Sequence, residues 1–365
     1  MEKGYFVISD ISGYSLFLNE SELDHANDII KSIIENITQN VISPLRISNF
    51  QGDAILTYAP AHLVLIGQTL VHQIENIYFD FKQHLKKMHF NTTCQCRACK
   101  NIPGLDLKFF VHYGEYAIQK IDKREELIGA DVILVHRLMK NDVVEKTGLK
   151  AYALITESAA QELGVTKFCE KLEDYEGEFE SVGHVKAKVY CLHTAWDKEL
   201  KSDKDRVMID PENEFVRVEV DVPYPPAVVW DYVTKSDFKQ DWMGMDNVTH
   251  TPAENKGYGK GSKYHCAHAH GDFVYEVKDW RPFDYMTVDG LAMGSFTYRQ
   301  MIIIKPTRDG SKVTVLLVPR NLNFFQGIKN KMLSKKMKEP FQQTMDNCWG
   351  SLGDYVKKHQ TELVH

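Results

Sequence analysis

A run of charged residues in the middle of the chain constrains its fold more than any other feature. Between Asp197 and Glu214, 11 of 18 residues are charged, and no apolar period there marks a helix or a strand. Because such a segment lacks the apolar pattern of a regular element, we interpret residues 197–214 as a linker between domains 1–196 and 215–365. The total of 365 residues also suits two hydrophobic cores better than one.

The charge balance argues against a nucleic-acid partner. Lys and Arg total 44 against 50 Asp and Glu, a net charge of −6, whereas binding to a polynucleotide needs a broad basic surface. The first residues carry only a short apolar run that ends at Asp10. No apolar stretch approaches the roughly 18 residues of a membrane span. We therefore expect a cytoplasmic protein with no signal peptide and no membrane span.

The first domain alternates strand and helix patterns. Apolar runs predict strands at 5–9, 45–50, 54–58 and 105–112, and helical spacing predicts helices at 23–37, 63–88 and 131–140. Gln51-Gly52-Asp53, between the second and third strands, is typical of a tight hairpin. This order predicts an α/β sandwich in which helices cover the sheet.

The second domain has a different pattern. Valines alternate with polar residues over 216–222, which predicts a half-exposed strand, and Pro225-Pro226 opens a short helix. Further strands are expected at 273–277, 285–288, 296–304 and 313–318. One long terminal helix is predicted from the apolar residues Met337, Phe341, Met345, Trp349, Leu352 and Val356. The domain is therefore expected to be α+β.

Two aspartates stand at strand ends in the first domain. Asp10 closes the first strand, and Asp53 lies in the hairpin. Carboxylates placed in this way can hold Mg²⁺ ions that neutralise a polyphosphate, although each could instead serve only its own turn. The residues after Asp10 are expected to form a small-residue turn that presents backbone N–H groups to an anion: Ile11, Ser12, Gly13 and Tyr14.

Four segments resemble, in order, the landmarks of class III adenylate/guanylate cyclase domains. They are FVISDISGY (6–14), FQGDA (50–54), VHYGE (111–115) and GADV leading to Arg137-Leu138 (129–138). The resemblance covers about residues 1–195. Within the superfamily, this part of the chain is similar to an uncharacterised, divergent bacterial branch. It implies a ferredoxin-like nucleotidyl-cyclase sandwich that acts as a homodimer. By position, Asp10 and Asp53 would bind Mg (or Mn), and the turn from Ile11 to Tyr14 would lie under a purine nucleoside triphosphate.

Other positions of that family differ here. Arg137 matches the arginine that stabilises the transition state, but Ile133 stands where the family has an asparagine. Because isoleucine cannot hydrogen-bond to a ribose, the resemblance implies either a slower or different cyclisation, or a nucleotide-binding or scaffold domain. At the two positions that select the base in the family, this chain has Asn49 and Glu126. Near the position of the family's triphosphate-binding lysine, it has His184 and Lys186.

Three cysteines crowd into one loop of the first domain. Cys94, Cys96 and Cys99 supply three soft ligands, so a structural Zn site is one interpretation, and free thiols or redox chemistry are the others. Arg97 and Lys100 would lower the thiol pKa if they lay near. Zinc would need a fourth ligand, for which the candidates are His84, His89, His112 and Cys169.

The second domain holds a histidine-rich strand. Cys266, His268 and His270 follow one another at period 2 and are expected on one strand face, as solvated polar residues, metal ligands or polar groups of a cavity.

Residues 215–365 resemble the START-like, polyketide-cyclase-like helix-grip (SRPBCC) superfamily, through the Pro225-Pro226 helix, Asp279-Trp280-Arg281-Pro282-Phe283 and the long terminal helix. The resemblance implies a cavity for a hydrophobic small molecule. The Met and aromatic residues of the terminal helix would line it or form plain core. Three functions stay open: a signalling protein that binds nucleotide and an apolar ligand, a dimeric scaffold with a lipid or metabolite carrier, and an enzyme acting on a polyketide or aromatic compound.

Overall fold

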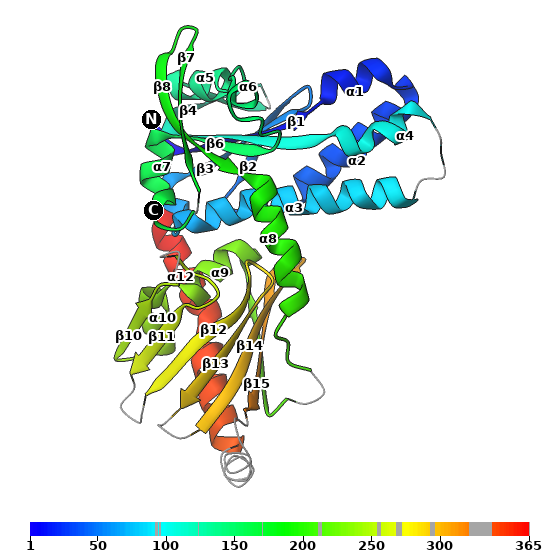
Figure 1. Ribbon diagram of the computed structural model, residues 1–365. Helices are drawn as coiled ribbons and strands as arrows, with labels where there is room; N and C mark the ends of the chain where they lie inside the picture. The colour runs from blue at the N-terminus through cyan, green and yellow to red at the C-terminus, as the bar shows by residue number, and fades with distance from the viewer. Residues whose placement is uncertain are drawn as a thin grey trace. The chain divides into compact units, whose positions relative to one another are not determined.

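The computed structural model describes the chain except for residues 92–93, 95, 123, 170, 211–213, 254–256, 268–271, 293–295, 321–337 and 365 (Figure 1). The chain divides into two compact units, Met1–Ser202 and Asp203–His365. The charged run that we interpret as a linker begins inside a helix, α8 (Leu192–Ser202), so its first residues are helical.

One sheet of eight strands forms the centre of the first unit. Its order is β2-β3-β1-β4-β6-β8-β7, with β5 paired to β4; β4 and β6 run parallel, and the other neighbours are antiparallel. The strands are β1 (Glu2–Ser12), β2 (Arg46–Gln51), β3 (Ala54–Pro60), β4 (Asp106–Ile121), β5 (Arg124–Ile128), β6 (Tyr152–Thr156), β7 (Glu173–Phe179) and β8 (Gly183–Cys191).

Helices cover both faces of this sheet. In β1, Tyr5 and Val7 pack on one core cluster and Phe6 and Ile8 on another, which explains why the strand reads as an unbroken apolar run. The first cluster includes residues of α2 (Leu23–Gln39), α3 (Gly67–Asn91) and α7 (Glu157–Leu163), and the second includes residues of α5 (Ala130–Arg137) and α6 (Val143–Thr147). Two short helices, α1 (Tyr14–Glu20) and α4 (Arg97–Asn101), complete the unit.

The second unit is an antiparallel sheet wrapped around a helix. Its seven strands have the order β10-β11-β12-β13-β14-β15-β9, and Figure 1 shows the terminal helical segment lying along the sheet. The strands are β9 (Val216–Val222), β10 (Asn247–Thr251), β11 (Lys263–Ala267), β12 (Phe273–Arg281), β13 (Tyr285–Ala292), β14 (Phe296–Thr307) and β15 (Gly310–Pro319).

Among the described residues of this unit, the α-helical segments are α9 (Pro226–Thr234), α10 (Ser236–Met243), residues 338–350 and α12 (Leu352–Val364). The expected single terminal helix is therefore interrupted at Ser351, whose hydroxyl donates to the carbonyls of Trp242 and, at 2.8 Å, Cys348. The predicted fold class, a mixed α/β sandwich followed by an antiparallel helix-grip unit, is confirmed. Across the described ranges, no helix combines the length and the apolar character needed to cross a membrane.

Candidate functional site

The two aspartates of the first unit come together at one end of β1. Asp10 pairs with Ala54 across β1 and β3, which places it beside Asp53 in the β2–β3 turn. Asp10 continues the alternation of Phe6 and Ile8, so its side chain lies on the face of the sheet that α5 covers. On the other side, Asp10 pairs with Lys108 of β4, whose Nζ lies 5.7 Å from the centre of the Tyr152 ring.

The electrostatics of this pair favour a bound cation. Burial and the negative charge of Asp10 raise the pKa of Asp53 to about 6. Burial also raises the pKa of Asp10, and the charge of Lys108 opposes that shift. Two neighbouring, partly buried carboxylates supply the hard oxygen ligands that Mg²⁺ takes from proteins, commonly together with substrate phosphates. The donor set therefore fits Mg or Mn.

The expected anion-binding turn is shorter than the sequence indicated. Ile11 and Ser12 belong to β1 and pair with Leu107 and Asp106 of β4. Ile11 is buried in the opposite core cluster. The turn is confined to Gly13, whose φ of 86° is left-handed, and Tyr14 already begins α1.

The residues at the family's transition-state positions lie on α5. Arg137 forms an ion pair of 3.4 Å with Glu180, and its side chain is one-third exposed. Ile133 is 55% exposed on the same helix. An exposed isoleucine in this place cannot be explained by packing within the unit.

The remaining positions taken from the family lie on three strands, β2, β5 and β8. The Oδ1 atom of Asn49, at a bulge in β2, is buried without a hydrogen-bond partner among the described residues. Glu126 is exposed on β5, opposite Gln119. His184 and Lys186 on β8 both approach Glu176, at 3.4 and 3.7 Å.

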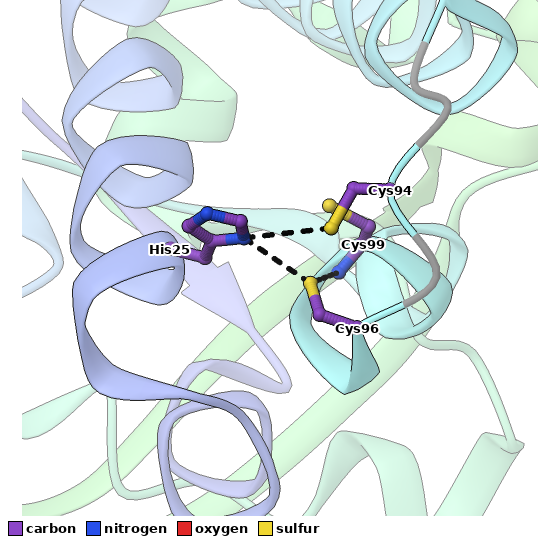
Figure 2. A group of neighbouring side chains, drawn as sticks. All are labelled: His25, Cys94, Cys96 and Cys99. Atoms are coloured by element: carbon purple, nitrogen blue, oxygen red, sulfur yellow. Dashed lines mark hydrogen bonds between the residues drawn. The ribbon is translucent and has the colours of Figure 1, made fainter.

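The three loop cysteines form a cluster with a residue that the sequence did not single out. One ligand atom from each of His25, Cys94, Cys96 and Cys99 lies within 4.8 Å of the others. Figure 2 shows the His25 ring, from the first turns of α2, pointing at the cysteines. The His25 Nδ1 atom lies 3.3 Å from Cys96 Sγ and 3.7 Å from Cys94 Sγ. Hydrogen bonds, first that of the Cys99 amide and then that of His25, lower the pKa of Cys96 to about 6.

The four ligand candidates named from the sequence lie elsewhere. His84 bonds to Ser32 at 2.9 Å, and His112 bonds to Thr156 at 2.9 Å. His89 is exposed near the end of α3, and burial raises the pKa of the Cys169 thiol. His25 was missed because it stands 69 residues before Cys94 and carries no motif of its own.

The second unit contains an apolar cavity between its sheet and its helices. It has a volume of about 60 Å³, counted as the space open to the centre of a water molecule. The walls come from α10, the strands and the terminal helix, and include Met243, Phe273, Val288, Ile302, Met345 and Trp349. Met345 and Trp349 thus line the cavity as the resemblance implied, whereas Phe341 is buried against Phe296. Met337 lies outside the described residues.

A row of aromatic residues crosses the sheet at this cavity. The strand register aligns Tyr264, Tyr275, Gly290 and Tyr298 on four successive strands, β11 to β14. The Tyr264 and Tyr275 rings stack with centres 5.0 Å apart. Gly290 leaves room for the Tyr298 ring, because a β-carbon there would lie 2.4 Å from its Cζ atom. Tyr275 and Tyr298 therefore present their side chains to the cavity.

Lys239 of α10 lines the cavity. It is 2% exposed, and its Nζ atom donates a 2.6 Å hydrogen bond to the Tyr275 hydroxyl. The same Nζ lies 4.5 and 5.0 Å from the ring centres of Tyr264 and Tyr275. Burial lowers the pKa of Lys239 to about 8. Within the described ranges, no carboxylate forms an ion pair with it.

Nothing in the sequence indicated that Lys239 is a site residue, because it stands in a polar stretch, SDFKQDWM, where a lysine is expected to face water. Of the histidine-rich strand, Cys266 is buried and lines the cavity. His268 and His270 lie outside the described residues.

Comparisons with known proteins match the two units separately. Residues 29–147 match a family model described as "Protein of unknown function (DUF2652)", and residues 215–352 match one described as "Polyketide cyclase / dehydrase and lipid transport". An uncharacterised protein of Mycobacterium tuberculosis is 34% identical over 149 residues, which cover 38% of this chain and 65% of that protein. The chain thus spans less than two-thirds of this relative.

Solved structures give similarity at low sequence identity. A bacterial light-regulated adenylyl cyclase is 11% identical, with 52% of this chain and 51% of that chain covered and a TM-score of 0.39. The adenylyl cyclase CyaB from P. aeruginosa is 14% identical, with 52% and 93% covered and a TM-score of 0.36.

DynU16, a protein in the dynemicin biosynthetic locus, is 17% identical, with 39% of this chain and 46% of that chain covered and a TM-score of 0.31. The family model that matches residues 215–352 confirms that the second unit is similar to the polyketide-cyclase and lipid-transport domains that its sequence resembles.

Proposed function

We propose that the second unit binds an apolar small molecule that carries an acidic group, with the acid at Lys239 and the apolar body against Met345 and Trp349. The observation that carries this proposal is a buried ammonium group in the wall of an apolar cavity. The family description of the matching model, which names lipid transport, supports the same class of ligand.

The reason lies in the cost of burying a charge. An ammonium group removed from water is strongly disfavoured unless other groups replace its hydration. Lys239 has one hydrogen bond, to Tyr275, and the faces of two aromatic rings, which contribute roughly 0.5–2 kcal/mol each at a desolvated site. A ligand carboxylate would supply the missing charge-assisted hydrogen bond, worth roughly 1.5–3 kcal/mol.

Two ligands of equal shape test this assignment. 2-Naphthoate and 2-naphthamide differ in charge but hardly in size, so calorimetric titration of the full chain with each isolates the contribution of the acid. We expect 2-naphthoate to bind at least tenfold more tightly. Lys239→Met should abolish that preference while the amide still binds, and Lys263→Met, at an exposed position of β11, should leave it unchanged. Equal affinity of the wild-type chain for the two ligands, or binding of neither, would refute the proposal.

A second candidate function concerns the first unit, and the Asp10–Asp53 pair favours it. We propose that this unit binds a divalent metal together with a purine nucleoside triphosphate, as a homodimer, and that Lys108 provides a cation next to the two carboxylates. Supporting this, burial raises both carboxylate pKa values, the charge of Asp10 raises that of Asp53 further, and a metal ion would offset both effects. The exposed Ile133 leaves cyclisation without the asparagine of the family, so binding is the stronger part of this proposal.

Melting temperatures of the full chain with ATP or GTP and Mg²⁺ or Mn²⁺ test the binding. We expect an upward shift that needs both metal and nucleotide and is lost in Asp10→Asn and Asp53→Asn. The exposed Asp197→Asn serves as the matched control. Detection of a cyclic nucleotide in the same samples would add the enzymatic step. A wild-type chain without a nucleotide-dependent shift would instead favour the scaffold, and size-exclusion chromatography with light scattering reports whether that scaffold is a dimer.

A further inference from the structure

We propose that His25, Cys94, Cys96 and Cys99 form a structural zinc site that ties the segment between α3 and β4 to the beginning of α2. This inference stands apart from both proposed functions, because the cluster belongs neither to the carboxylate pair nor to the cavity of the second unit. The motif suggested three ligands, and the fold supplies the fourth.

The distances agree with a tetrahedral site. With Zn–S bonds of about 2.3 Å and Zn–N bonds of about 2.0–2.1 Å, a tetrahedron has edges of ~3.8 Å between two sulfurs and ~3.6 Å between sulfur and nitrogen. The His25 Nδ1 atom lies 3.3 Å from Cys96 Sγ and 3.7 Å from Cys94 Sγ, and all four ligand atoms lie within 4.8 Å of one another. Shifts of a few tenths of an ångström would seat the ion.

The backbone around the cluster is already arranged for thiolate ligands. Cys96 caps α4, and its sulfur accepts a hydrogen bond from the Cys99 amide at 3.4 Å. Cys96 accepts a hydrogen bond from a backbone amide, and the side chain of the cysteine three residues later lies close to it. The two sulfurs can therefore provide two neighbouring corners of a tetrahedral site. Cys99 is buried, Cys94 and Cys96 are half-buried, and His25 is exposed, so the site lies at the surface with its cysteine side partly covered. All seven cysteines are described, and none is disulfide-bonded.

Four protein ligands leave no coordination position open for a substrate, so the role of the ion is structural. A second link joins the same elements: Glu22, just before α2, accepts a hydrogen bond of 3.2 Å from the Ala98 amide and approaches the Arg97 Nε at 3.6 Å. α4 also contacts α1, the helix that follows the Asp10 strand. Zinc would therefore brace the corner of the first unit formed by α1, α2 and α4.

Metal content of the full chain, purified with a thiol reductant, tests the site. We expect one zinc per chain by inductively coupled plasma mass spectrometry. The cobalt(II)-substituted protein should show intense thiolate-to-cobalt absorption and the d–d bands of a tetrahedral site. In competition with a chelator, His25→Ala and Cys96→Ser should each bind zinc more than tenfold more weakly than the wild type does. His89→Ala and Cys191→Ser, which change a histidine and a cysteine of the same unit outside the cluster, should retain zinc as the wild type does.

The cobalt titration of the unmodified chain keeps the inference falsifiable even if a variant fails to fold. Absence of stoichiometric zinc together with absence of tetrahedral cobalt bands would overturn it. Equal loss of zinc in His89→Ala and His25→Ala would also overturn it, since the fourth ligand would then not be His25. A disulfide within the cluster under reducing conditions, detected by mass spectrometry of peptides, would point to redox chemistry in place of zinc.

Discussion

Asp131, at the start of α5, lies directly against Gly114 of β4. A β-carbon built on Gly114 would come within 2.3 Å of the Asp131 Oδ2 atom. That carboxylate accepts a 2.6 Å hydrogen bond from the Glu115 amide, and His112 Nε2 lies 3.1 Å from its other oxygen. The two sequence segments VHYGE and GADV thus form one packed joint between α5 and the sheet.

This joint predicts a large effect from a small substitution. Gly114→Ala should destabilise the first unit by about 1–3 kcal/mol, because the new methyl group overlaps a carboxylate that two neighbours hold in place. Differential scanning calorimetry of the full chain measures this as a lower melting temperature of one transition. Gly104→Ala is the matched control, since a β-carbon there meets open space, and its melting temperature should stay near the wild-type value. Equal effects of the two substitutions would show that the joint does not constrain α5.

The carboxylate pair predicts an unusual dependence on pH. The folded state raises the pKa of Asp53 from 3.8 to about 6, so it binds this proton more tightly than the unfolded state does. The contribution of Asp53 to stability is therefore present below pH 3.8 and is lost as the pH rises toward 6. Without metal, Asp53→Asn should become more stable relative to the wild type as the pH rises from 4 to 7, as measured by urea unfolding.

Mn²⁺ should make the wild type more stable than Asp53→Asn at neutral pH, the reverse of the order expected without metal. An ion at the proposed site would bind the ionised carboxylates, so the stabilisation that it gives the wild type should grow as the pH rises through 6 and should be absent in Asp53→Asn. A stabilisation by Mn²⁺ that is equal at pH 5 and pH 7.5 would argue that the ion binds elsewhere.

Lys239 predicts a pH dependence at the alkaline end. Its folded-state pKa of about 8 lies below the ordinary 10.5, so folding penalises the charged form, by on the order of 3 kcal/mol. That penalty is constant below pH 8 and is relieved as the pH rises from 8 to 10.5. Between pH 8 and 9.5, the unfolding free energy of the second unit should therefore rise more steeply in the wild type than in Lys239→Met. The same slope in both proteins would mean that Lys239 titrates normally, and Lys263→Met should behave as the wild type.

Local patterns in the sequence predicted those elements whose burial on one or two faces leaves a readable period, whereas strands such as β6 and β7 were not predicted. The run Phe6–Ile8 predicted β1, and the alternating valines predicted β9, with Val216, Val218 and Val222 buried. Paired Asp10 and Asp53 could be anticipated for the same reason, since both follow directly from strand ends.

The contacts that give the sites their chemistry depend on tertiary structure and left no such pattern. His25 joins cysteines that are about 70 residues away, and its neighbours in α2 predict only an amphipathic helix. Lys239 has the sequence surroundings of a surface lysine, yet the fold buries it beside the rings of Tyr264 and Tyr275. The end of β1 was also misplaced, because Ile11 and Ser12 extend the strand by pairing with β4, a segment about 95 residues later.

Gly290 gives the last prediction, which separates the shape of the cavity from the stability of the second unit. A β-carbon at this position would lie 2.4 Å from Tyr298 Cζ and 2.6 Å from its hydroxyl oxygen, so Gly290→Ala must displace the far end of the ring. Because Tyr298 lines the cavity, the displaced ring takes up space that a ligand needs. We expect binding of 2-naphthamide, which does not depend on the charge of Lys239, to weaken at least tenfold, while Gly259→Ala, which meets open space, leaves it unchanged. Unaltered binding in Gly290→Ala would show that the ligand occupies a part of the cavity away from the tyrosine row.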